Sequence, residues 1–514
     1  MSKTIIIIGA GLAGLSAALQ AAENGCNVKL VSSLPSERAQ SVMAEGGINA
    51  ALNTKDENDS PEEHFTDTIK AACGLADPNA VWGMTQAAPE LVHWLLKLGV
   101  KFNMSGYDDV DLRNFGGQKK KRTAFAQSDT GKQIMTAMID AVRRKEASGM
   151  VERFSHHSFL TLRLCGNICC GCVIRDEYSQ ETVELPGDAV IVATGGMHGL
   201  FGNTTGSLSN TGEVTAELFR LGVPLANGEM IQYHPTTVKC GGKRMLISEA
   251  ARGEGGRLFA MKDGKQWYFM EEKYPELGNL MPRDITAREI WKVSHESEVF
   301  LDMTEISEEI ISNKLSGLAD DCMTYLHKDI RKEPVSVLPG IHYFMGGILV
   351  DEQHRTPIQN LYAAGECCAQ YHGANRLGGN SLLGALYGGR VAAKSACEQA
   401  DVVDLSCATQ IDVPPASQIS EIKQLNKVMQ ETMGVVRNEN TLLNGIQTVQ
   451  ALTGNLPLLG MAVLKSALAR KESRGAHWRE DYPKSNDDDY LKTTVARFDG
   501  KQIQISFVPV PERR

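Results

Sequence analysis

Three glycines near the N-terminus constrain this chain more than any other feature. Gly9, Gly11 and Gly14 follow the β-branched run "TIIII" and open the alanine-rich run "LAGLSAALQAA". A G-x-G-x-x-G turn between a strand and a helix lets backbone and Ala10 approach a pyrophosphate at the helix N-terminus. Such glycines also serve the packing of a βαβ unit that binds nothing. The stretch 3–31 therefore predicts strand, glycine turn, helix and strand, with a dinucleotide as the favoured ligand.

Two later segments indicate which dinucleotide is bound. The second strand of the first unit ends in Ser32 and Ser33, whereas NAD sites usually place an acidic residue there to bind the ribose. The segment "DAVIVATGG" (188–196) predicts another buried strand that runs into glycines. A third segment, "NLYAAGE", places Glu366 just beyond a late strand. This order favours one FAD site built from three separate segments.

Length and composition bound the remaining possibilities. At 514 residues the chain is long enough for two or three domains. Its net charge of -9 excludes the basic surface typical of nucleic-acid binding, so an acidic substrate must be attracted by local arginine and histidine. The N-terminal apolar run lacks a cleavage pattern, and no stretch reaches transmembrane length. We expect no contact with nucleic acid and a membrane contact only through partner proteins.

The twelve cysteines are scattered, apart from four in the cluster "CGNICCGC" between two alternating stretches, "SFLTLRL" and "VIRDEY". A metal site is conceivable there, but the spacing matches no common zinc or iron-sulfur pattern. We therefore expect the two strands of a hairpin and no metal site. The absence of a regular disulfide spacing fits a reducing compartment.

Charged and imidazole groups lie beside glycine or proline in five places. They are "QYHPTT" with His234, "ISEAARGEGGRL" with Ser248, "MPRDITAR" with Arg283, "IHYFMGG" with His342 and "GANRLGGNS" with Arg376. Each group alone could serve a structural role such as a helix cap or a surface ion pair. Together they suit a dicarboxylate, because arginine offers a bidentate fork and histidine and serine add single donors.

These segments and others resemble one protein family over nearly the whole chain. "GAGLAGLSAAL", "AEGGINAAL", "NFGGQ", "QYHPT", "SEAARGEGGRL", "HYFMGGI", "HGANRLGGNSLL" and "ARKESRGAHWREDYP" occur in this order in flavoprotein subunits of fumarate reductase and succinate dehydrogenase. L-aspartate oxidase is a close relative. The resemblance implies an α/β fold: a two-dinucleotide-binding, Rossmann-like FAD domain with an inserted α+β capping domain and a C-terminal helical domain.

The expected boundaries divide the chain into four parts. Residues 1–230 and 343–410 form the FAD domain, 231–342 the capping domain, and 411–514 the helical domain with a short β-like tail. The residues expected to contact FAD are Gly9, Ala10, Gly11, Gly14, Ser32, Gln40, Ser41, Ala44, Gly46, Gly47, Ala193, Thr194, Gly195, Glu366, Asn380, Ser381 and Leu382.

The resemblance also implies the roles of the charged residues. His234, Ser248, His342 and Arg376 would hold the two carboxylates of a small dicarboxylate, with Phe115 and Gly47 on the flavin side. Arg283 would protonate one alkene carbon of fumarate while the flavin delivers hydride to the other. Because arginine has a pKa above about 12, it needs rapid reprotonation, and Glu249 and Arg252 occupy the positions of the family's proton relay. His372 could either contact the substrate or support its loop.

Two departures from the family bear on function. Respiratory members carry a histidine, covalently bonded to the flavin, where Gln40 stands, so we expect noncovalent FAD and hence fumarate reduction more than succinate oxidation. L-aspartate oxidase uses a glutamate for the substrate amine where Phe115 stands here, which argues against that activity. A reductase of another unsaturated acid stays open as an alternative. We further expect an iron-sulfur electron-transfer subunit as partner, and a cytoplasmic protein or one peripheral on the inner face of the membrane.

Overall fold

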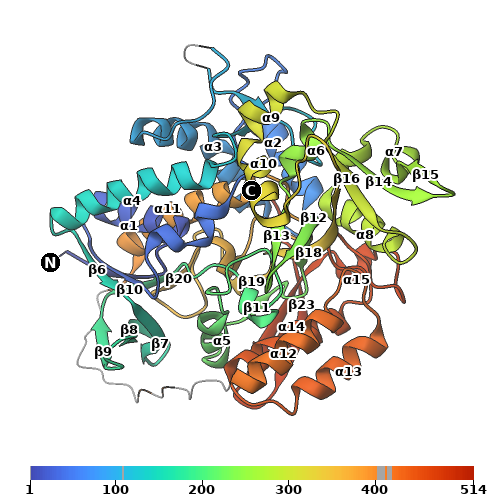
Figure 1. Ribbon diagram of the computed structural model, residues 1–514. Coiled ribbons are helices and arrows are strands. Elements are labelled where there is room, and N and C mark those ends of the chain that lie inside the picture. The colour runs from blue at the N-terminus through green and yellow to red at the C-terminus, as the bar shows by residue number, and fades with distance from the viewer. Residues whose placement is uncertain (1, 107–108, 402–410, 412, 414–418) are drawn as a thin grey trace.

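A five-stranded parallel sheet lies beside the N-terminus, on the left in Figure 1. The computed structural model describes residues 2–106, 109–401, 411, 413 and 419–514. The sheet has the order β20-β10-β1-β2-β6. Its strands are β1 (Thr4–Ile8), β2 (Asn27–Ser32), β6 (Val151–Ser155), β10 (Ala189–Val192) and β20 (Leu361–Ala363). The three segments that predict one FAD site are therefore neighbours: β10 pairs with β1 on one side and with β20 on the other.

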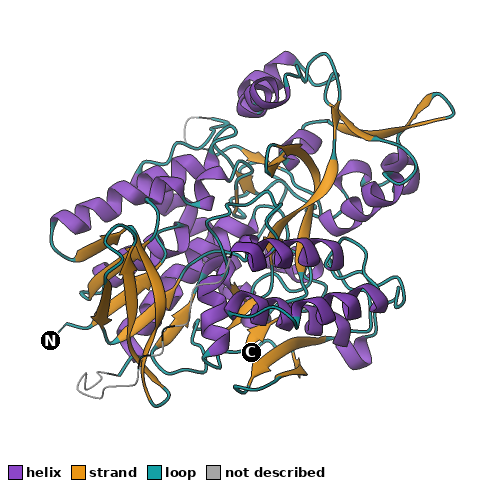
Figure 2. Cartoon of the chain, turned by 60° about the horizontal axis from the view of Figure 1, so that its bottom comes forward, coloured by secondary structure: helices purple, strands orange, loops and turns teal. Residues whose placement is uncertain are grey.

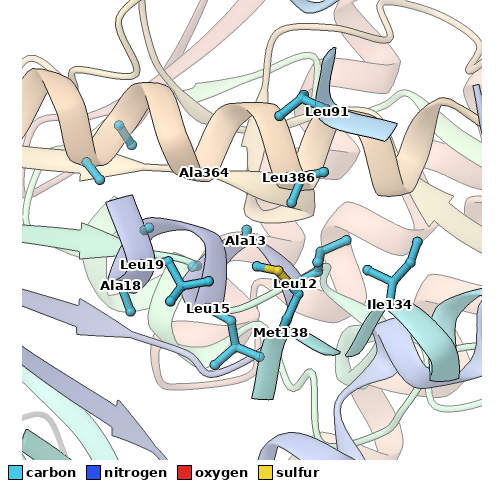
Figure 3. Close-up of a cluster of buried hydrophobic side chains, with 14 of the residues drawn as sticks. Leu12, Ala13, Leu15, Ala18, Leu19, Leu91, Ile134, Met138, Ala364 and Leu386 are labelled. Carbon is cyan, nitrogen blue, oxygen red and sulfur yellow. The ribbon is translucent and has the colours of Figure 1, made fainter. Parts of the chain in front are cut away.

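Alternation along β1 sorts its side chains between two layers. Ile5 and Ile7 pack into a helical layer, whereas Ile6 and Ile8 pack against the opposite side of the sheet. Figure 3 shows the helical side, where Leu12 and Leu15 lie near Leu386 and other apolar side chains. The helices of this layer are α1 (Leu12–Glu23), α3 (Pro78–Leu98), α4 (Thr130–Ala147) and α11 (Asn380–Gln399).

The other face of the sheet is covered by β7 (His157–Cys165), β8 (Ile168–Asp176) and β9 (Thr182–Pro186). β7 and β8 pair antiparallel, so the predicted hairpin around the cysteine cluster is confirmed. Cys169 and Cys172 are free thiols that pack with Ile6 and Ile8. Among the described residues no group of three or more His, Cys, Asp or Glu could hold a metal ion.

Residues from 231 to 344 fold around a core of their own. β12 (Ile231–Cys240) pairs with β13 (Lys243–Leu246) and β18 (Leu338–Phe344), and a second sheet has the order β15-β14-β16-β17. Its strands are β14 (Arg257–Lys262), β15 (Lys265–Trp267), β16 (Val299–Asp302) and β17 (Val335–Ser336). The helices are α6 (Glu249–Gly253), α7 (Phe269–Lys273), α8 (Arg283–Val293), α9 (Glu308–Lys314) and α10 (Ser316–Asp321). Their shared core supports the proposed insertion of a capping domain at 231–342.

The C-terminal part is helical and then extended, as predicted. α12 (Ile419–Thr432), α13 (Glu439–Val449) and α14 (Asn455–Ala469) lie together in Figure 2 and pack on Phe201, Phe219 and Phe344. A short helix, α15 (Asp487–Tyr490), precedes β22 (Lys492–Phe498) and β23 (Ile503–Pro509). The predicted domain start at 411 falls in a stretch of which only residues 411 and 413 are described.

The β-like tail belongs to a sheet that the sequence did not reveal. β22 and β23 extend the order β21-β19-β11-β22-β23, whose other strands are β11 (Leu225–Ala226), β19 (Gly347–Leu349) and β21 (Cys368–Ala369). The end of the chain is thus joined to its middle by backbone hydrogen bonds.

The remaining helices and strands are α2 (Pro61–Ala71), α5 (Glu213–Arg220) behind the Gly212 turn, and a small sheet of β3 (Ile48–Asn49), β4 (Leu112–Arg113) and β5 (Thr123–Ala124).

Candidate functional site

A cleft of about 560 Å³ runs from the glycine turn after β1 to the residues of the capping domain. The predicted site residues that line it are Gly9, Ala10, Gly11, Ser32, Gln40, Ser41, Ala44, Gly46, Gly47, Phe115, Ala193, Thr194, Gly195, His234, Ser248, Glu249, Arg283, His342, Glu366, Arg376, Ser381 and Leu382. Gly14, Arg252 and Asn380 are not among its lining residues. The fold therefore brings the expected cofactor and substrate residues to one cavity.

The glycine turn leaves room for a ligand only on one side. A Cβ on Gly9, which has φ of +110°, would lie 2.3 Å from the carbonyl oxygen of Ala193, and a Cβ on Gly14 would lie 1.9 Å from that of Gly9. These two glycines are required for packing of the strand, turn and helix. A Cβ on Gly11 would meet nothing closer than 3.7 Å, the Oγ of Ser41. Gly11 faces the cleft, and α1 begins there without a side-chain cap.

Several polar groups along this end of the cleft fit FAD. The Oγ of Ser32 is buried and has no hydrogen-bond partner, so it could bind a ribose hydroxyl in place of the usual acidic residue. The N-terminus of α1 offers backbone N–H groups to a pyrophosphate. Glu366 accepts a hydrogen bond from the backbone N–H of Phe344 at 3.1 Å. One Glu366 oxygen also lies 3.6 Å from Nε2 of His198.

Asn380 does not extend this set, although its neighbours Ser381 and Leu382 line the cleft. Its Nδ2 donates to Thr68 at 3.0 Å, and its Oδ1 accepts from Asn49 at 2.7 Å and lies 2.9 Å from Nε2 of His64. The side chain is fully buried. Asn380 therefore has its hydrogen-bonding groups satisfied within the protein, which favours support of the α11 start over direct contact with a cofactor.

Gln40 borders the cleft in a short 3-10 helix, Gln40–Met43. Its Oε1 accepts a hydrogen bond from the backbone N–H of Ser207 at 2.5 Å. This contact holds the Gln40 side chain against the segment that follows β10. The amide of Gln40 can donate and accept hydrogen bonds toward a ligand in the cleft.

Three buried charges form a chain at the capping-domain end of the cleft. Nε and Nη2 of Arg283 both donate to Oε2 of Glu249, at 2.8 and 2.6 Å. Nη2 of Arg252 donates to the other carboxylate oxygen at 3.3 Å. Arg283 lines the cleft whereas Arg252 lies behind Glu249. A proton path from Arg252 through Glu249 to Arg283 would thus run from the protein interior to the cavity.

The electrostatics of this chain keep Glu249 ionised. Burial by itself raises the pKa of the Glu249 carboxyl, but Arg283 and Arg252 outweigh it and hold that pKa below its usual range. The backbone N–H of Gly116 adds a hydrogen bond at 3.2 Å. Burial lowers the pKa of Arg252, and Glu249 opposes that shift. The carboxylate therefore acts as an acceptor that can pass a proton between the two guanidiniums.

The remaining cationic and imidazole groups have unpartnered nitrogens near the same region. Nε2 of His234 and Nε of Arg376 are buried without hydrogen-bond partners. His234 and His342 lie on paired strands, β12 and β18, with ring centroids 5.1 Å apart. Their pairing is irregular on both sides of Tyr233 and His234, and Pro235 follows. Such an irregularity turns side chains of a strand toward a site.

Burial and neighbouring guanidiniums set the charge of these groups. Burial and Arg283 lower the pKa of His234 and of His342 well below the usual value, so both rings are neutral hydrogen-bonding groups at neutral pH. Burial and Arg283 lower the pKa of Arg376 to about 9. Its guanidinium lies 4.2 Å from the ring centroid of Tyr343. Arg376 is therefore a charged donor at pH 7, and its buried Nε is available to bind an anion.

Ser248 and Phe115 complete the lining. Ser248 is the N-cap of α6, and its Oγ accepts from the N–H of Ala250 at 3.4 Å, which leaves the hydroxyl proton for a ligand. Phe115 is 2% exposed. A Cβ on Gly46 would lie 2.9 Å from its ring, so glycine is needed for the ring to pack there. Gly47 has φ of +137° and a Cβ there would lie 2.5 Å from the carbonyl oxygen of Ala124.

Two functional positions escaped the sequence analysis although they lie within quoted motifs. Gln232, two residues before His234, accepts from Nη1 of Arg283 at 3.1 Å and donates to the backbone oxygen of Arg376 at 2.8 Å. Glu45, directly before Gly46, lines the cleft, and its Oε2 is buried without a partner. The available signal was their position, because Gln232 stands two residues before His234 and Glu45 directly precedes two glycines.

His372 lies beside the cleft lining without being part of it. It packs edge-on against Tyr343, with ring centroids 5.3 Å apart, and against Tyr371. Burial and Arg376 lower its pKa well below the usual value. Of the two roles open to His372, these contacts favour support of the Arg376 loop. As for the membrane, none of the described helices combines the length and apolar character needed to cross one.

Similarity to known proteins agrees with this geometry. A family model described as "FAD binding domain" matches residues 4–382, and one described as "Fumarate reductase flavoprotein C-term" matches residues 452–513. The succinate dehydrogenase flavoprotein subunit of Bacillus subtilis is 38% identical, covering 100% of this chain and 98% of the relative. The 8-methylmenaquinol:fumarate reductase flavoprotein subunit of Wolinella succinogenes is 32% identical, covering 100% and 92%.

A solved structure extends the likeness to three dimensions. The quinol fumarate reductase of E. coli superposes with a TM-score of 0.90 at 27% identity, covering 99% of this chain and 97% of that one. The fold of the FAD-binding part and of the C-terminal part is thus that of one known group. The chain belongs to the family of FAD-dependent oxidoreductases formed by the flavoprotein subunits of succinate dehydrogenase and fumarate reductase.

Proposed function

We propose that this protein reduces fumarate to succinate with noncovalently bound FAD. The observation that carries the proposal is the buried chain of Arg283, Glu249 and Arg252 at a cavity that also contains the unpartnered donors of His234 and Arg376. A dianion with two carboxylates would satisfy these donors. One end of the cavity fits a dinucleotide, and the other end presents the donors and the proton chain.

The chain's own residues would bind, polarise and protonate the substrate. Arg376, His234, His342 and the Ser248 hydroxyl hold the two carboxylates, which withdraws electron density from the distal alkene carbon. When bound and reduced, FAD supplies the hydride for that carbon. Arg283 gives a proton to the adjacent carbon, and Glu249 and Arg252 restore it. Because these groups are buried, water is kept from the reacting atoms.

The direction of the reaction follows from Gln40 in this proposal. Without a covalent bond the flavin is expected to have a lower potential, which favours reduction of fumarate. Succinate oxidation is the second candidate, since the Bacillus subtilis relative bears that name. Acid precipitation tests the attachment: yellow FAD should be released into the supernatant, and flavin that stays with the pellet would contradict noncovalent binding. The ratio of fumarate reduction to succinate oxidation then tests the direction.

Reoxidation of the reduced protein tests the reaction itself. The FAD is reduced under anaerobic conditions, fumarate is added, and the return of flavin absorbance is followed, with oxaloacetate and crotonate in parallel. We expect rapid reoxidation by fumarate and little by crotonate, which has one carboxylate. Reoxidation by crotonate instead would indicate another unsaturated acid. Bleaching of the oxidised protein by aspartate would indicate L-aspartate oxidase, against which the apolar ring of Phe115 argues.

Electrons for the FAD must come from another protein in this proposal. The described residues contain no group that could hold a metal ion, and the relatives are named as subunits. We propose an iron-sulfur subunit as the donor, with the chain on the cytoplasmic side and held at the inner face of the membrane only through such partners. Copurification of iron with a tagged chain expressed in its own cell tests this association, and its absence would favour a soluble electron carrier.

A further inference from the structure

The motif "ARKESRGAHWREDYP" has no part in the site described so far. Its residues 470–482 form what we call the brace loop, and buried charges hold it in one conformation. Arg470 bonds to Glu229 and to Glu472, each at 2.7 Å, and Arg479 bonds to Asp481 at 2.6 Å. Arg470 and Arg479 are fully buried. Because these buried charges fix the brace loop, it can hold the segments that pack against it in place.

The brace loop first contacts the loop that carries Arg376. The backbone N–H of Ala476 donates to the carbonyl oxygen of Ala374, two residues before Arg376, at 2.9 Å. Gly475 has φ of +54°, and a Cβ there would lie 2.5 Å from the same oxygen. The two backbones are therefore in direct contact. This contact does not involve the side chain of Trp478.

The brace loop also contacts the helix that begins with Arg283. The guanidinium of Arg288 on α8 lies 4.0 Å from the ring centroid of Trp478. Arg288 and Asp284 are one turn apart and so share a face of α8. The backbone oxygen of Trp478 accepts from the N–H of Arg437 at 3.0 Å, which holds the backbone of the loop at this residue. α8 also packs on β12 and β18.

We propose that Trp478 is a positioning residue for Arg283. Glu249 and Gln232 hold the guanidinium, while the Arg288–Trp478 contact fixes the rotation of α8 about its axis. A misplacement of about 1 Å at a reacting group can cost about a hundredfold in rate, so small rotations of this helix matter. The inference rests on the proposed role of Arg283, but its structural part stands independently of any substrate.

Hydrogen exchange tests the structural part without substrate. In W478L the amides of 283–293 should exchange about three- to tenfold faster than in the wild type, since an arginine–indole contact is lost. W478F, which keeps an aromatic face under Arg288, should exchange at close to the wild-type rate. The control W267L removes a tryptophan of the capping domain, on β15, whose ring centroid lies 4.7 Å from Nζ of Lys262 on β14. Unchanged exchange of α8 in W478L would overturn the proposal.

Kinetics test the functional part with purified protein of known FAD content. W478L should lower kcat for fumarate reduction about five- to tenfold with the apparent KM within about twofold, because the backbone contact to the Arg376 loop is intact. Its solvent isotope effect on kcat should rise as proton delivery becomes slower. W478F should restore kcat, and W267L should leave it unchanged. A fall in kcat with no rescue by W478F would mean general loss of structure and would refute positioning.

R288Q provides an independent variant should W478L fail to fold. It removes the other half of the contact, so it should reproduce the kcat loss, and the double variant should be no worse than either single one. Additive losses would contradict a shared contact. Should the wild type neither reduce fumarate nor oxidise succinate, the proposed function fails. The exchange measurement still decides whether Trp478 holds α8.

Discussion

Arg283 donates two hydrogen bonds to a single oxygen of Glu249 and a third to Gln232, which only a planar guanidinium can do at once. R283K should therefore keep the charge and the bound FAD but lower kcat for fumarate reduction about 10²- to 10⁴-fold, the usual contribution of a general acid. Steady-state rates and flavin absorbance measure the two quantities. Near-normal turnover would remove Arg283 from the acid role. R331K, the same substitution at an exposed arginine outside the cleft lining, is the matched control.

Arg376 has a buried Nε without a partner and belongs to the carboxylate clamp in our proposal. R376A should raise the apparent KM for fumarate about 30-fold or more, since loss of one partner of a buried charge pair costs about 2 kcal/mol or more. Titration of the oxidised protein with fumarate, followed by flavin absorbance, measures the same loss at equilibrium. An unchanged affinity would refute the clamp.

The lowered pKa of Arg376, about 9, gives the clamp a pH dependence. The guanidinium is charged below that pH and neutral above it, so fumarate affinity should be constant from pH 7 to about 8.5 and fall about tenfold per unit well above pH 9. A fumarate titration at each pH measures the profile. Because burial and Arg283 keep His234 and His342 neutral, no histidine step should occur between pH 6 and 7.5. A flat profile to pH 10 would contradict a lowered pKa.

At the scale of elements, Glu45 lies where the loop before β3 meets α10 of the capping domain. Burial and Asp321 raise the pKa of Glu45 to about 8, against the effect of Arg113. The pKa is about 4.3 in an unfolded chain, so the folded protein is favoured with Glu45 protonated. This stabilisation is complete at low pH and declines as pH rises from about 4.5 to 8.

E45Q should therefore be more stable than the wild type at high pH. The difference in Tm should be small at pH 5 and grow to several degrees at pH 8.5, because the amide has no ionised form to bury. Thermal unfolding at a series of pH values measures it. E309Q, at an exposed position on α9, should follow the wild-type curve. Parallel curves for E45Q and the wild type would contradict the raised pKa.

The molecule as a whole depends on the junction between its C-terminal part and the strands that precede the capping domain. Glu229, fully buried, binds Arg470 at 2.7 Å and Thr494 on β22 at 2.5 Å. E229Q should cost about 1.5–3 kcal/mol of unfolding free energy, because a buried charge-assisted hydrogen bond is lost while Glu472 still compensates the charge of Arg470. Urea denaturation measures this loss, provided unfolding is cooperative.

An exposed ion pair serves as a control that separates the effect of burial on the unfolding free energy from the effect of ion pairing itself. Glu308 and Arg331 are 3.3 Å apart with side-chain exposures of 68% and 43%. E308Q should change the unfolding free energy by no more than about 0.5 kcal/mol, as exposed pairs usually do. Equal losses in E229Q and E308Q would contradict the assignment of Glu229 as the junction between the two parts.

The sequence by itself determined the features that rest on local sterics and periodicity. The buried strand β1 with its continuous apolar run, the glycine turn that follows it, and the helices at 419–432 and 455–469 follow from residue type and spacing. The same holds for the hairpin at the cysteine cluster. The resemblance added the identities of the site residues, and the fold brings nearly all of them to one cleft.

Only the tertiary structure decided which distant groups meet and how deeply they are buried. No spacing indicated that Arg288 would lie on Trp478, that β22 would pair with β11, or that Asn380 would be satisfied by Thr68 and Asn49. The low pKa of Arg376 and the high pKa of Glu45 likewise depend on burial. The reason is physical: local conformation is set by neighbours along the chain, whereas desolvation and charge pairing are set by packing between segments far apart in sequence.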